Sequence, residues 1–319
     1  MPISNETLKK PAKTYLFGYP LKRSYSPFLH NTLYKILHVP RTYSKWETLS
    51  IEEVVAATHA EDFVGAAVTM PHKVAICKHC DDMTEEGRAI GACNTIFWRK
   101  EADGSRKLVG HNTDCIGVRD SFLLDAGPHL TKNRSRPGMI VGGGGASRSA
   151  VYAMAVYLNC SPIYVVNRDE SEVEHMIADF KKSATPSFNP EMIHVKTPEQ
   201  AKELPAPAYI VSAIPCFPPK TPEEIAARNT LEAILAKPEK GAILEMCYHP
   251  HIWTDICTIA RDSGWRVITG EVAMIWQGIE QQKVWLDCKQ EELPVKQTFD
   301  IVVKQVKADS ANHTEPPDF

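Results

Sequence analysis

A run of glycines at residues 142–145 is the clearest chemical feature of the chain. The apolar segment Gly138–Val141 precedes it, and residues 149–158, with helical character, follow it. Glycines allow a tight turn and a close approach of the backbone to a ligand, and a helix that begins behind the turn offers free N–H groups to an anion. This order of strand, loop and helix is typical of a site for the pyrophosphate of a dinucleotide.

An acidic residue follows the next expected strand, Ile163–Val166, in the sequence Asn167-Arg168-Asp169. An acid at this point of a Rossmann unit binds ribose hydroxyls and repels a 2′-phosphate, which favours NAD over NADP. Arg168 argues the other way because a guanidinium pairs with phosphate, but the glutamates that follow make the segment acidic, so we expect NAD. Asp169 can equally be an acid at the start of a solvated helix, and both roles can hold together.

Polar residues also stand at the ends of expected elements in the first part of the chain. They are two hydroxyls, a threonine with a lysine beyond it, an amide and a carboxylate, namely Ser24 and Ser26, Thr69 and Lys73, Asn94, and Asp114. Ligands of open α/β sheets bind outside the carboxyl ends of strands, so we expect these side chains to share one cleft. An amine beside a carboxylate is suited to moving a proton at a ligand hydroxyl. Taken singly, each residue also fits a structural role, such as a helix cap or a solvated charge.

The composition limits the class of protein. The chain has 319 residues, of which 43% are hydrophobic, so we expect two well-packed domains. The net charge of −3 argues against nucleic acid as a partner. No apolar run has the length of a membrane span, and the N-terminal residues lack the apolar core of a signal peptide. We therefore expect a cytoplasmic protein with no membrane partner.

The nine cysteines are odd in number and scattered, which indicates reduced thiols rather than a disulfide framework. The segment Cys77-Lys78-His79-Cys80 has metal-binding residue types, but no second Cys/His pair with suitable spacing completes a zinc site. We expect no metal, and we interpret this segment as a helix with incidental thiols.

Alternating strand and helix patterns predict an α/β fold, with a mainly parallel sheet in an N-terminal domain and a Rossmann domain around the glycines. We expect residues 1–114 and 270–319 to form a substrate domain and residues 115–269 to form the NAD-binding domain. The expected strands are residues 15–20, 41–47, 65–71, 138–141, 163–166, 192–195, 208–212, 242–245 and 265–268.

The expected helices begin near Ser26, Ser50 and Asp169 or cover residues 117–124, 149–158, 272–285 and 296–307. At the first of these helices we expect Ser26 to be the cap and Pro27 the first helical residue. Residues 308–319 are polar and are expected to be a disordered tail.

Six segments in a fixed order carry a resemblance to a known family. Their patterns are Ser-x-Ser-Pro-x-x-His-Asn, Val-Thr-x-Pro-x-Lys, Gly-Ala-x-Asn-Thr, Asn-Thr-Asp-x-x-Gly, Gly-x-Gly-Gly-Ala-Ser-Arg, and Gln-Gly with a later Trp. In this chain they are residues 24–31, 68–73, 91–95, 112–117, 142–148, and 277–278 with Trp285. Through these motifs, which spread over residues 15–285, the chain resembles the shikimate/quinate dehydrogenase family.

The resemblance implies roles for the candidate residues. Lys73 and Asp114 are implied as the catalytic pair. The implied substrate-binding residues are Ser24, Ser26 and Tyr248 at a carboxylate and Thr69, Asn94, Asp114 and Gln277 at ring hydroxyls. The implied cofactor-binding residues are Gly142, Gly144, Gly145, Ala146 and Ser147 at the pyrophosphate, Asn167, Arg168 and Asp169 at the adenosine ribose, Ala213 along the cofactor and Gly270 near the nicotinamide.

The implied activity is the NAD-dependent oxidation of quinate to 3-dehydroquinate, and of shikimate to 3-dehydroshikimate, by hydride transfer. In this reaction Lys73 transfers the hydroxyl proton, and Asp114 orients the lysine and the hydroxyl.

The chain also departs from the family pattern. His72 directly precedes Lys73, and we expect it to be exposed. Ala273 stands where the family usually has a methionine near the nicotinamide. Asp169 and Glu172 stand where members that use NADP have Thr and a basic residue, which implies an NAD-specific catabolic enzyme like the fungal quinate dehydrogenases.

Two alternatives remain at this level. One is an NADP-dependent shikimate dehydrogenase of aromatic amino-acid biosynthesis, and the other is a non-catalytic sensor of quinate. The preference between quinate and shikimate depends on packing around the substrate that the sequence does not show. The sequence does not define the oligomeric state either.

Overall fold

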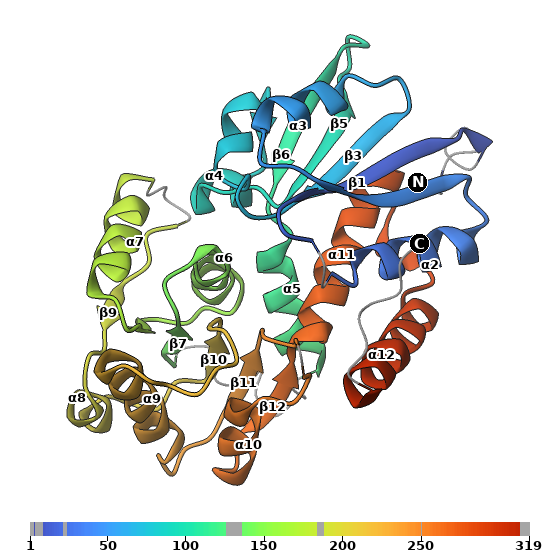
Figure 1. Cartoon of the computed structure of the whole chain (residues 1–319). Helices are drawn as coiled ribbons and strands as arrows, with labels where there is room; N and C mark the ends of the chain where they lie inside the picture. Colours follow the sequence, from blue (N-terminus) through green and yellow to red (C-terminus); the bar gives the residue numbers. More distant parts are fainter. Residues whose placement is uncertain are drawn as a thin grey trace. The chain divides into compact units, whose positions relative to one another are not determined.

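The computed structural model describes residues 3, 9–21, 24–125, 136–183, 188–249 and 251–312. The chain divides into two compact units, of which unit 1 is Met1–Thr113 with Met274–Phe319 and unit 2 is Asp114–Ala273. In the described residues each unit contains a sheet of six strands (Figure 1). The expected α/β class with two domains is confirmed.

The sheet of unit 1 has the order β2-β1-β3-β5-β6-β4. Its strands are β1 (Ala12–Gly18), β2 (Arg41–Glu47), β3 (Phe63–Val68), β4 (Asp82–Met83), β5 (Thr95–Lys100) and β6 (Arg106–His111). β1 pairs in parallel with β2 and β3, and β4 pairs in parallel with β6, whereas β5 is antiparallel to β3 and β6. The sheet is therefore mainly parallel, with an antiparallel hairpin inserted.

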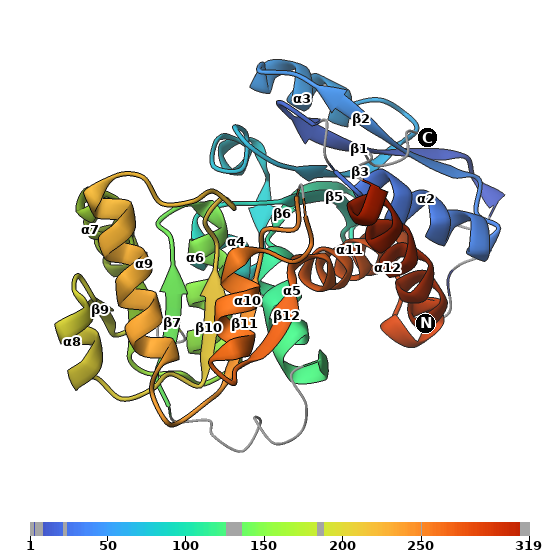
Figure 2. The same ribbon diagram turned by 60° about the horizontal axis from the view of Figure 1, so that its bottom comes forward.

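Helices lie on both faces of this sheet, α3 on one and α2 and α11 on the other (Figures 1 and 2). The helical segments of unit 1 are α2 (Ser26–Leu37), α3 (Ile51–Thr58), η1 (Ala75–His79), α4 (Glu85–Ile90), α11 (Gly270–Leu286, which starts in unit 2), η4 (Gln290–Glu292) and α12 (Val295–Asn312). α11 packs closely against β3 because Gly65 of β3 has no side chain. A Cβ at Gly65 would lie 2.3 Å from Nε1 of Trp285.

The sheet of unit 2 has the order β12-β11-β10-β7-β8-β9, and all of its strand pairs are parallel. Its strands are β7 (Gly138–Val141), β8 (Ile163–Val166), β9 (Met192–His194), β10 (Tyr209–Ser212), β11 (Ala242–Glu245) and β12 (Arg266–Thr269). In chain order this is the doubly wound Rossmann arrangement, whose strand order reverses between the first and the fourth strand. Here these are β7 and β10, so the predicted Rossmann topology is confirmed.

α5 and α6 cover one face of this sheet, and α9 and α10 cover the other (Figures 1 and 2). The helical segments of unit 2 are α5 (Asp114–Asp120), η2 (Ser121–Asp125), α6 (Gly145–Tyr152), η3 (Ala153–Tyr157), α7 (Glu170–Lys182), α8 (Pro198–Glu203), α9 (Pro222–Leu235) and α10 (Asp255–Asp262). The core beneath α9 and α10 includes buried apolar residues of the strands together with Leu231, Ile234 and Ile256 of the helices.

Some expected elements differ from the structure. α2 begins at Ser26, but Tyr25 is the residue before it, and the Ser24 hydroxyl accepts the N–H of Ser26 at 3.2 Å. Ser26 is therefore not the cap. α12 continues to Asn312, so the tail expected from residue 308 is helical at its start. The rest of that tail lies outside the described residues.

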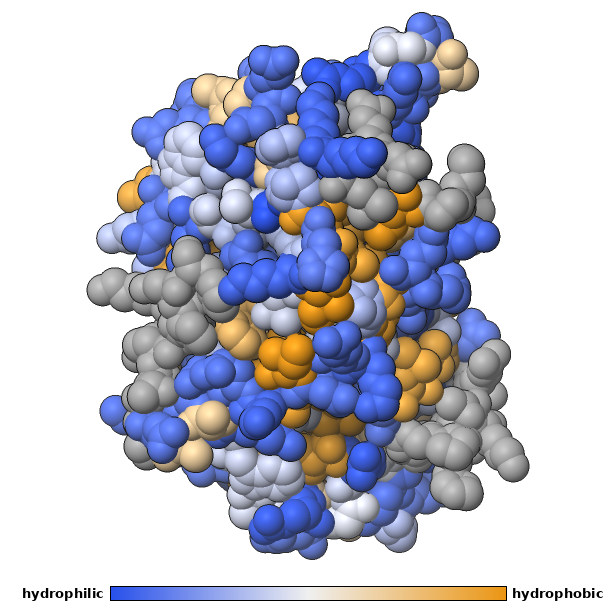
Figure 3. Space-filling view, turned by 90° about the vertical axis from the view of Figure 1, so that its right-hand side faces the viewer, coloured by the Kyte–Doolittle hydropathy of each residue, from blue (hydrophilic) through white to orange (hydrophobic). Residues whose placement is uncertain are grey.

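The molecular surface in Figure 3 is mostly hydrophilic, with smaller hydrophobic areas between charged and polar residues. Among the described residues, none of the helices combines the length and the apolar character needed to cross a lipid bilayer.

Candidate active site

The glycine loop of unit 2 connects β7 to α6. Gly142 has φ of +122°, in the region that L side chains rarely adopt. A Cβ at Gly143 would lie 2.6 Å from Oε2 of Glu172, so this glycine is required by a close neighbour. By contrast, no atom lies within 4 Å of a Cβ built at Gly144 or Gly145. The loop thus turns sharply and leaves open space in front of the N-terminus of α6.

Two further features of the loop fit an anionic ligand. The hydroxyl of Ser147 is buried and has no hydrogen-bond partner in the described structure. Gly145, Ala146 and Ser147 form the first turn of α6, where backbone N–H groups have no partner inside the helix. The residues present therefore fit the pyrophosphate of a dinucleotide.

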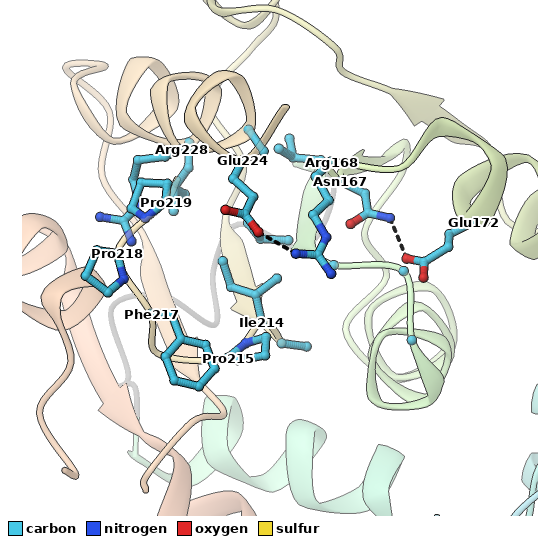
Figure 4. A pocket seen from close by; sticks show the side chains of 18 residues that line it. Asn167, Arg168, Glu172, Ile214, Pro215, Phe217, Pro218, Pro219, Glu224 and Arg228 are labelled. Atoms are coloured by element: carbon cyan, nitrogen blue, oxygen red, sulfur yellow. Dashed lines mark hydrogen bonds and ion pairs between the residues drawn. The ribbon is translucent and has the colours of Figure 1, made fainter. Parts of the chain in front are cut away.

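A cavity of about 280 Å³ lies beside this loop (Figure 4). Residues 142–144, the end of β8, residues 213–215 and 217–219, and α9 line it, and the wall includes Asn167, Arg168 and Ala213. Part of its lining is polar, because Arg168 pairs with Glu224 and Asn167 pairs with Glu172 (Figure 4). A nucleoside fits this combination of apolar and charged lining residues.

The structure gives Asp169 a capping role. Its Oδ1 accepts the N–H of Ser171 at 2.9 Å and the Ser171 hydroxyl at 2.7 Å, at the start of α7. These bonds lower the pKa of Asp169. Asp169 is absent from the cavity wall described above, whereas Glu172, one turn further along, lines it. The charge of Glu172 supported the prediction of NAD from the sequence, but Glu172 was not among the predicted cofactor-binding residues.

The amide of Asn94 is the centre of a polar network in unit 1. Its Oδ1 accepts the backbone N–H of Thr113 at 2.7 Å, and its Nδ2 donates to Oε1 of Gln277 at 3.3 Å. The hydroxyl of Thr113 also donates to this Gln277 oxygen, at 3.1 Å. Asn94 precedes β5, Thr113 follows β6 and Gln277 lies on α11, so the network joins two neighbouring strand ends to a helix.

Lys73 and Asp114 are each linked to this network through the backbone. The carbonyl of Lys73 accepts the N–H of Cys93 at 2.8 Å, and Cys93 directly precedes Asn94. Asp114 directly follows Thr113, whose N–H is bound by Asn94, and it begins α5.

The end of β3 is also bonded to the polar network, because the N–H of Val68 donates to the carbonyl of Asn94 at 2.7 Å. Thr69 follows Val68 and is partly buried.

His72 is buried rather than exposed, so the expectation for this residue is wrong. Only 3% of it is accessible, and its Nε2 donates to the carbonyl of Thr48 at 2.8 Å. The reason is the turn after β3, which folds the imidazole toward the segment that precedes α3.

A buried histidine that sequence reasoning did not single out supports α11. His30 of α2 lies 3.1 Å from Oε1 of Gln281 through Nε2 and 2.7 Å from Nε2 of Gln282 through Nδ1. Burial lowers the pKa of His30 to about 3, so the ring is neutral. Gln281 in turn donates to the hydroxyl of Thr95 at 2.9 Å. The place of His30 within the first family motif was the available signal.

The remaining candidates lie at the start of α2, in the segment after β11 and at the start of α11. Ser24 and Ser26 are partly exposed and are joined by the bond given above. Burial raises the pKa of Tyr248, which keeps its hydroxyl protonated. Gly270 begins α11, and a Cβ there would lie 2.4 Å from the carbonyl oxygen of Met246, so only glycine permits this approach. Within the described residues no group of His, Cys, Asp and Glu side chains is arranged to hold a metal ion.

Comparison with known proteins identifies the family. Residues 16–96 match the model of the shikimate dehydrogenase substrate binding domain. A quinate dehydrogenase of Emericella nidulans is 46% identical in an alignment that covers 85% of this chain and 86% of that relative. The chain belongs to the shikimate/quinate dehydrogenase family.

Other members of the shikimate/quinate dehydrogenase family are parts of longer chains. The pentafunctional AROM polypeptide of Eremothecium gossypii is 34% identical over 93% of this chain, which spans only 18% of that protein. A solved structure of dehydroquinate dehydratase and shikimate dehydrogenase from S. pombe AroM has a TM-score of 0.73 and 32% identity. The match covers 92% of this chain and 53% of the S. pombe chain.

A shikimate 5-dehydrogenase from Listeria monocytogenes, solved in complex with shikimate and NAD, has a TM-score of 0.74 at 22% identity. The match covers 92% of this chain and 96% of the Listeria chain, and it shows a shared fold. As a member of the family, this chain is an oxidoreductase of the quinate/shikimate dehydrogenase type.

Proposed function

We propose that this chain is an NAD-dependent quinate dehydrogenase that also oxidises shikimate. Its products are 3-dehydroquinate and 3-dehydroshikimate. The observation that carries the proposal is the 46% identity to a quinate dehydrogenase across most of both chains. The glycine loop and the cavity beside it support the use of a dinucleotide. The nine cysteines, none of which is in a disulfide in the described structure, support a reducing compartment, for which we propose the cytoplasm.

The proposed substrate site consists of the candidate substrate-binding residues named above. Asn94 and Gln277, already held in place by Thr113, would bind ring hydroxyls together with Thr69 and Asp114. The hydroxyls of Ser24, Ser26 and Tyr248 would bind the carboxylate. Because Asn94 and Gln277 are fixed by hydrogen bonds before substrate enters, little ordering is needed on binding.

Lys73 and Asp114 are the proposed catalytic residues. Lys73 would take the proton of the hydroxyl that is oxidised, and Asp114 would hold the lysine and that hydroxyl in line. The backbone of Lys73 is held by the hydrogen bond from the N–H of Cys93 to its carbonyl. The backbone of Asp114 is held through the preceding residue, Thr113, whose N–H donates to Asn94.

The dinucleotide would be held by unit 2. When bound, it supplies the acceptor for the hydride that leaves the substrate carbon. Gly142, Gly144, Gly145, Ala146 and Ser147 would hold the pyrophosphate. Asn167, Arg168 and Asp169 would surround the adenosine ribose, with Ala213 further along the cofactor and Gly270 near its nicotinamide. Glu172 joins this set because it lines the cavity. Its carboxylate, like that of Asp169, favours a ribose hydroxyl over a 2′-phosphate.

The second candidate function is an NADP-dependent shikimate dehydrogenase. The similarity to the AROM polypeptides favours it, and Arg168 provides a guanidinium at the cavity. A non-catalytic sensor of quinate is the third candidate and has less support, because Lys73 and Asp114 are both present.

Steady-state rates with quinate and shikimate, each with NAD and with NADP, test the proposal. We expect the highest kcat/KM for quinate with NAD, and a lower but measurable value for shikimate with NAD. A preference for NADP with shikimate would support the second candidate. Binding of quinate without turnover under any of the four conditions would support the third.

A further inference from the structure

Arg168, whose side chain is mostly exposed, forms an ion pair on the wall of the cavity of unit 2. Its Nη1 lies 2.5 Å from Oε1 of Glu224, and both residues line the cavity. Figure 4 shows the two side chains meeting, one from the segment after β8 and the other from the start of α9. The two residues are 56 positions apart in sequence, so this contact is a product of the fold.

Glu224 is fixed before it meets Arg168. It is part of a capping box with Thr221, in which its Oε2 accepts the backbone N–H of Thr221 at 3.2 Å and that of Lys220 at 2.8 Å. These backbone bonds and Arg168 lower the pKa of Glu224, so it is a carboxylate at neutral pH. Oε2 of Glu224 therefore accepts the N–H groups at the start of α9, and Oε1 accepts from the guanidinium of Arg168.

This arrangement has a consequence for the charge of the cavity. A guanidinium near the adenosine ribose is the group that would bind a 2′-phosphate. Because Arg168 is paired with Glu224, the pair carries no net charge. A 2′-phosphate beside Arg168 would also lie near the carboxylate of Glu224. The other charged residues of the wall are Glu172, which accepts a hydrogen bond from Asn167 at 2.8 Å, and Arg228, whose charge acts on Glu245.

We propose that Glu224 is a specificity-determining residue that excludes the 2′-phosphate of NADP by occupying Arg168. The inference rests on the proposed function, because it concerns the dinucleotide of that function. It assigns part of the preference for NAD to a residue on α9, outside the segment after β8 that carries Asp169 and Glu172. It also explains how an arginine at this position is compatible with NAD.

The test is calorimetric binding of two nucleotide fragments, 2′,5′-ADP and 5′-ADP, to the full chain and to Glu224→Gln. Glutamine keeps an oxygen that can accept the N–H groups of Lys220 and Thr221, and it removes the charge. We expect Glu224→Gln to tighten 2′,5′-ADP binding by about tenfold and to change 5′-ADP binding by less than about threefold. The ratio of kcat/KM for NAD to that for NADP should fall by a similar factor.

Glu223→Gln is the matched control, because Glu223 is an exposed neighbour at the same helix terminus and is not part of the cavity wall. It should leave both affinities unchanged. Adding Arg168→Ala to Glu224→Gln should abolish the gain for 2′,5′-ADP, because the freed guanidinium is then absent. An unchanged fragment ratio in Glu224→Gln, an equal change in Glu223→Gln, or a gain that survives the loss of Arg168 would each overturn the inference.

Fragment binding also separates this inference from the proposed function. If the wild-type chain oxidises neither quinate nor shikimate but Glu224→Gln still gains 2′,5′-ADP affinity, the proposed function fails and the role of Glu224 stands. If the wild type is active and the fragment ratio does not move, only the inference fails. If neither fragment binds to the wild type, the cavity is not a nucleotide site and both are wrong.

Discussion

Glu245, at the end of β11, is a buried carboxyl group with an incomplete set of partners. Its Oε1 accepts the N–H of Cys247 at 2.9 Å, whereas its Oε2 is buried without a hydrogen-bond partner in the described structure. Burial raises the pKa of Glu245 to about 7, against the lowering effects of the Cys247 N–H, of the neighbouring Ser212 hydroxyl and of the charge of Arg228. Only 1% of the residue is accessible, so solvent does little to offset this effect.

The raised pKa of Glu245 predicts how stability depends on pH. Between the ordinary pKa of 4.5 and about 7, the folded chain binds a proton that the unfolded chain releases. The contribution of protonated Glu245 to the free energy of unfolding is complete below pH 4.5 and is lost as the pH rises through about 7. Glu245→Gln should therefore raise the Tm at pH 8 by an amount that corresponds to roughly 2–3 kcal/mol, and should have little effect at pH 5.

Thermal unfolding followed by circular dichroism over this pH range measures the effect. The exposed Glu223→Gln is the control, and it should leave the pH profile of the wild type unchanged. If Glu245→Gln and the wild type keep a constant difference in Tm from pH 5 to pH 8, Glu245 does not titrate as described.

At this scale the sequence predicted residue types better than their partners. The serines, Asn94 and Gln277 were found from motifs, but the contact of Asn94 with Gln277 joins residues 183 positions apart. No local pattern indicates such a contact. His72 was misjudged for the same reason, since its partner Thr48 lies on another segment.

Two glycines show how elements depend on the absence of a side chain. Gly65 in β3 lies against Trp285 of α11, and an added Cβ would also lie 2.7 Å from the carbonyl oxygen of Ile96. Gly144, before α6, has open space around it and an extended backbone (φ −79°, ψ −171°) that any residue adopts. The first glycine is needed for packing, whereas the second leaves room for a ligand.

Alanine at these two positions should therefore have opposite effects. Gly65→Ala should destabilise unit 1 by about 1–3 kcal/mol through overpacking and lower the Tm. Gly144→Ala should change stability by less than about 1 kcal/mol, but its methyl group should weaken 5′-ADP binding several-fold. Thermal unfolding and calorimetry on both variants measure this. Wild-type nucleotide affinity in Gly144→Ala, with the fold intact, would contradict the assignment of the loop.

The expected elements were mostly correct where a hydrophobic pattern was strong. β7 and β8 have the predicted bounds because they are apolar throughout, and β11 has them with a single charged residue, Glu245, at its end. β2 also has the predicted bounds, although its residues neither alternate strictly nor are mostly apolar. The hairpin of β5 and β6 was missed, since charged residues such as Arg99 and Lys107 interrupt its pattern. Asp103-Gly104, where Gly104 has φ of +85°, was the turn signal that could have indicated it.

At the scale of the whole molecule, the chain crosses between its units after Thr113 and after Ala273. Both crossings coincide with candidate residues, since Asp114 begins unit 2 and α11, which crosses the second seam, carries Gly270 and Gln277. Asp114 also stands directly before a helix that is expected from the sequence. The α/β class and the Rossmann topology were predicted from strand–helix alternation, which depends on local pattern alone.

The central claim concerns the pair Lys73 and Asp114, and a double-mutant cycle of kcat at saturating quinate and NAD tests it most directly. Lys73→Ala and Asp114→Asn should each lower kcat by about 10²–10⁴. Together they should lower it little further, because residues that act as one unit are not additive. The Kd for NAD should stay near the wild-type value in all variants. Wild-type kcat in either single variant, or losses that multiply in the double variant, would contradict the account.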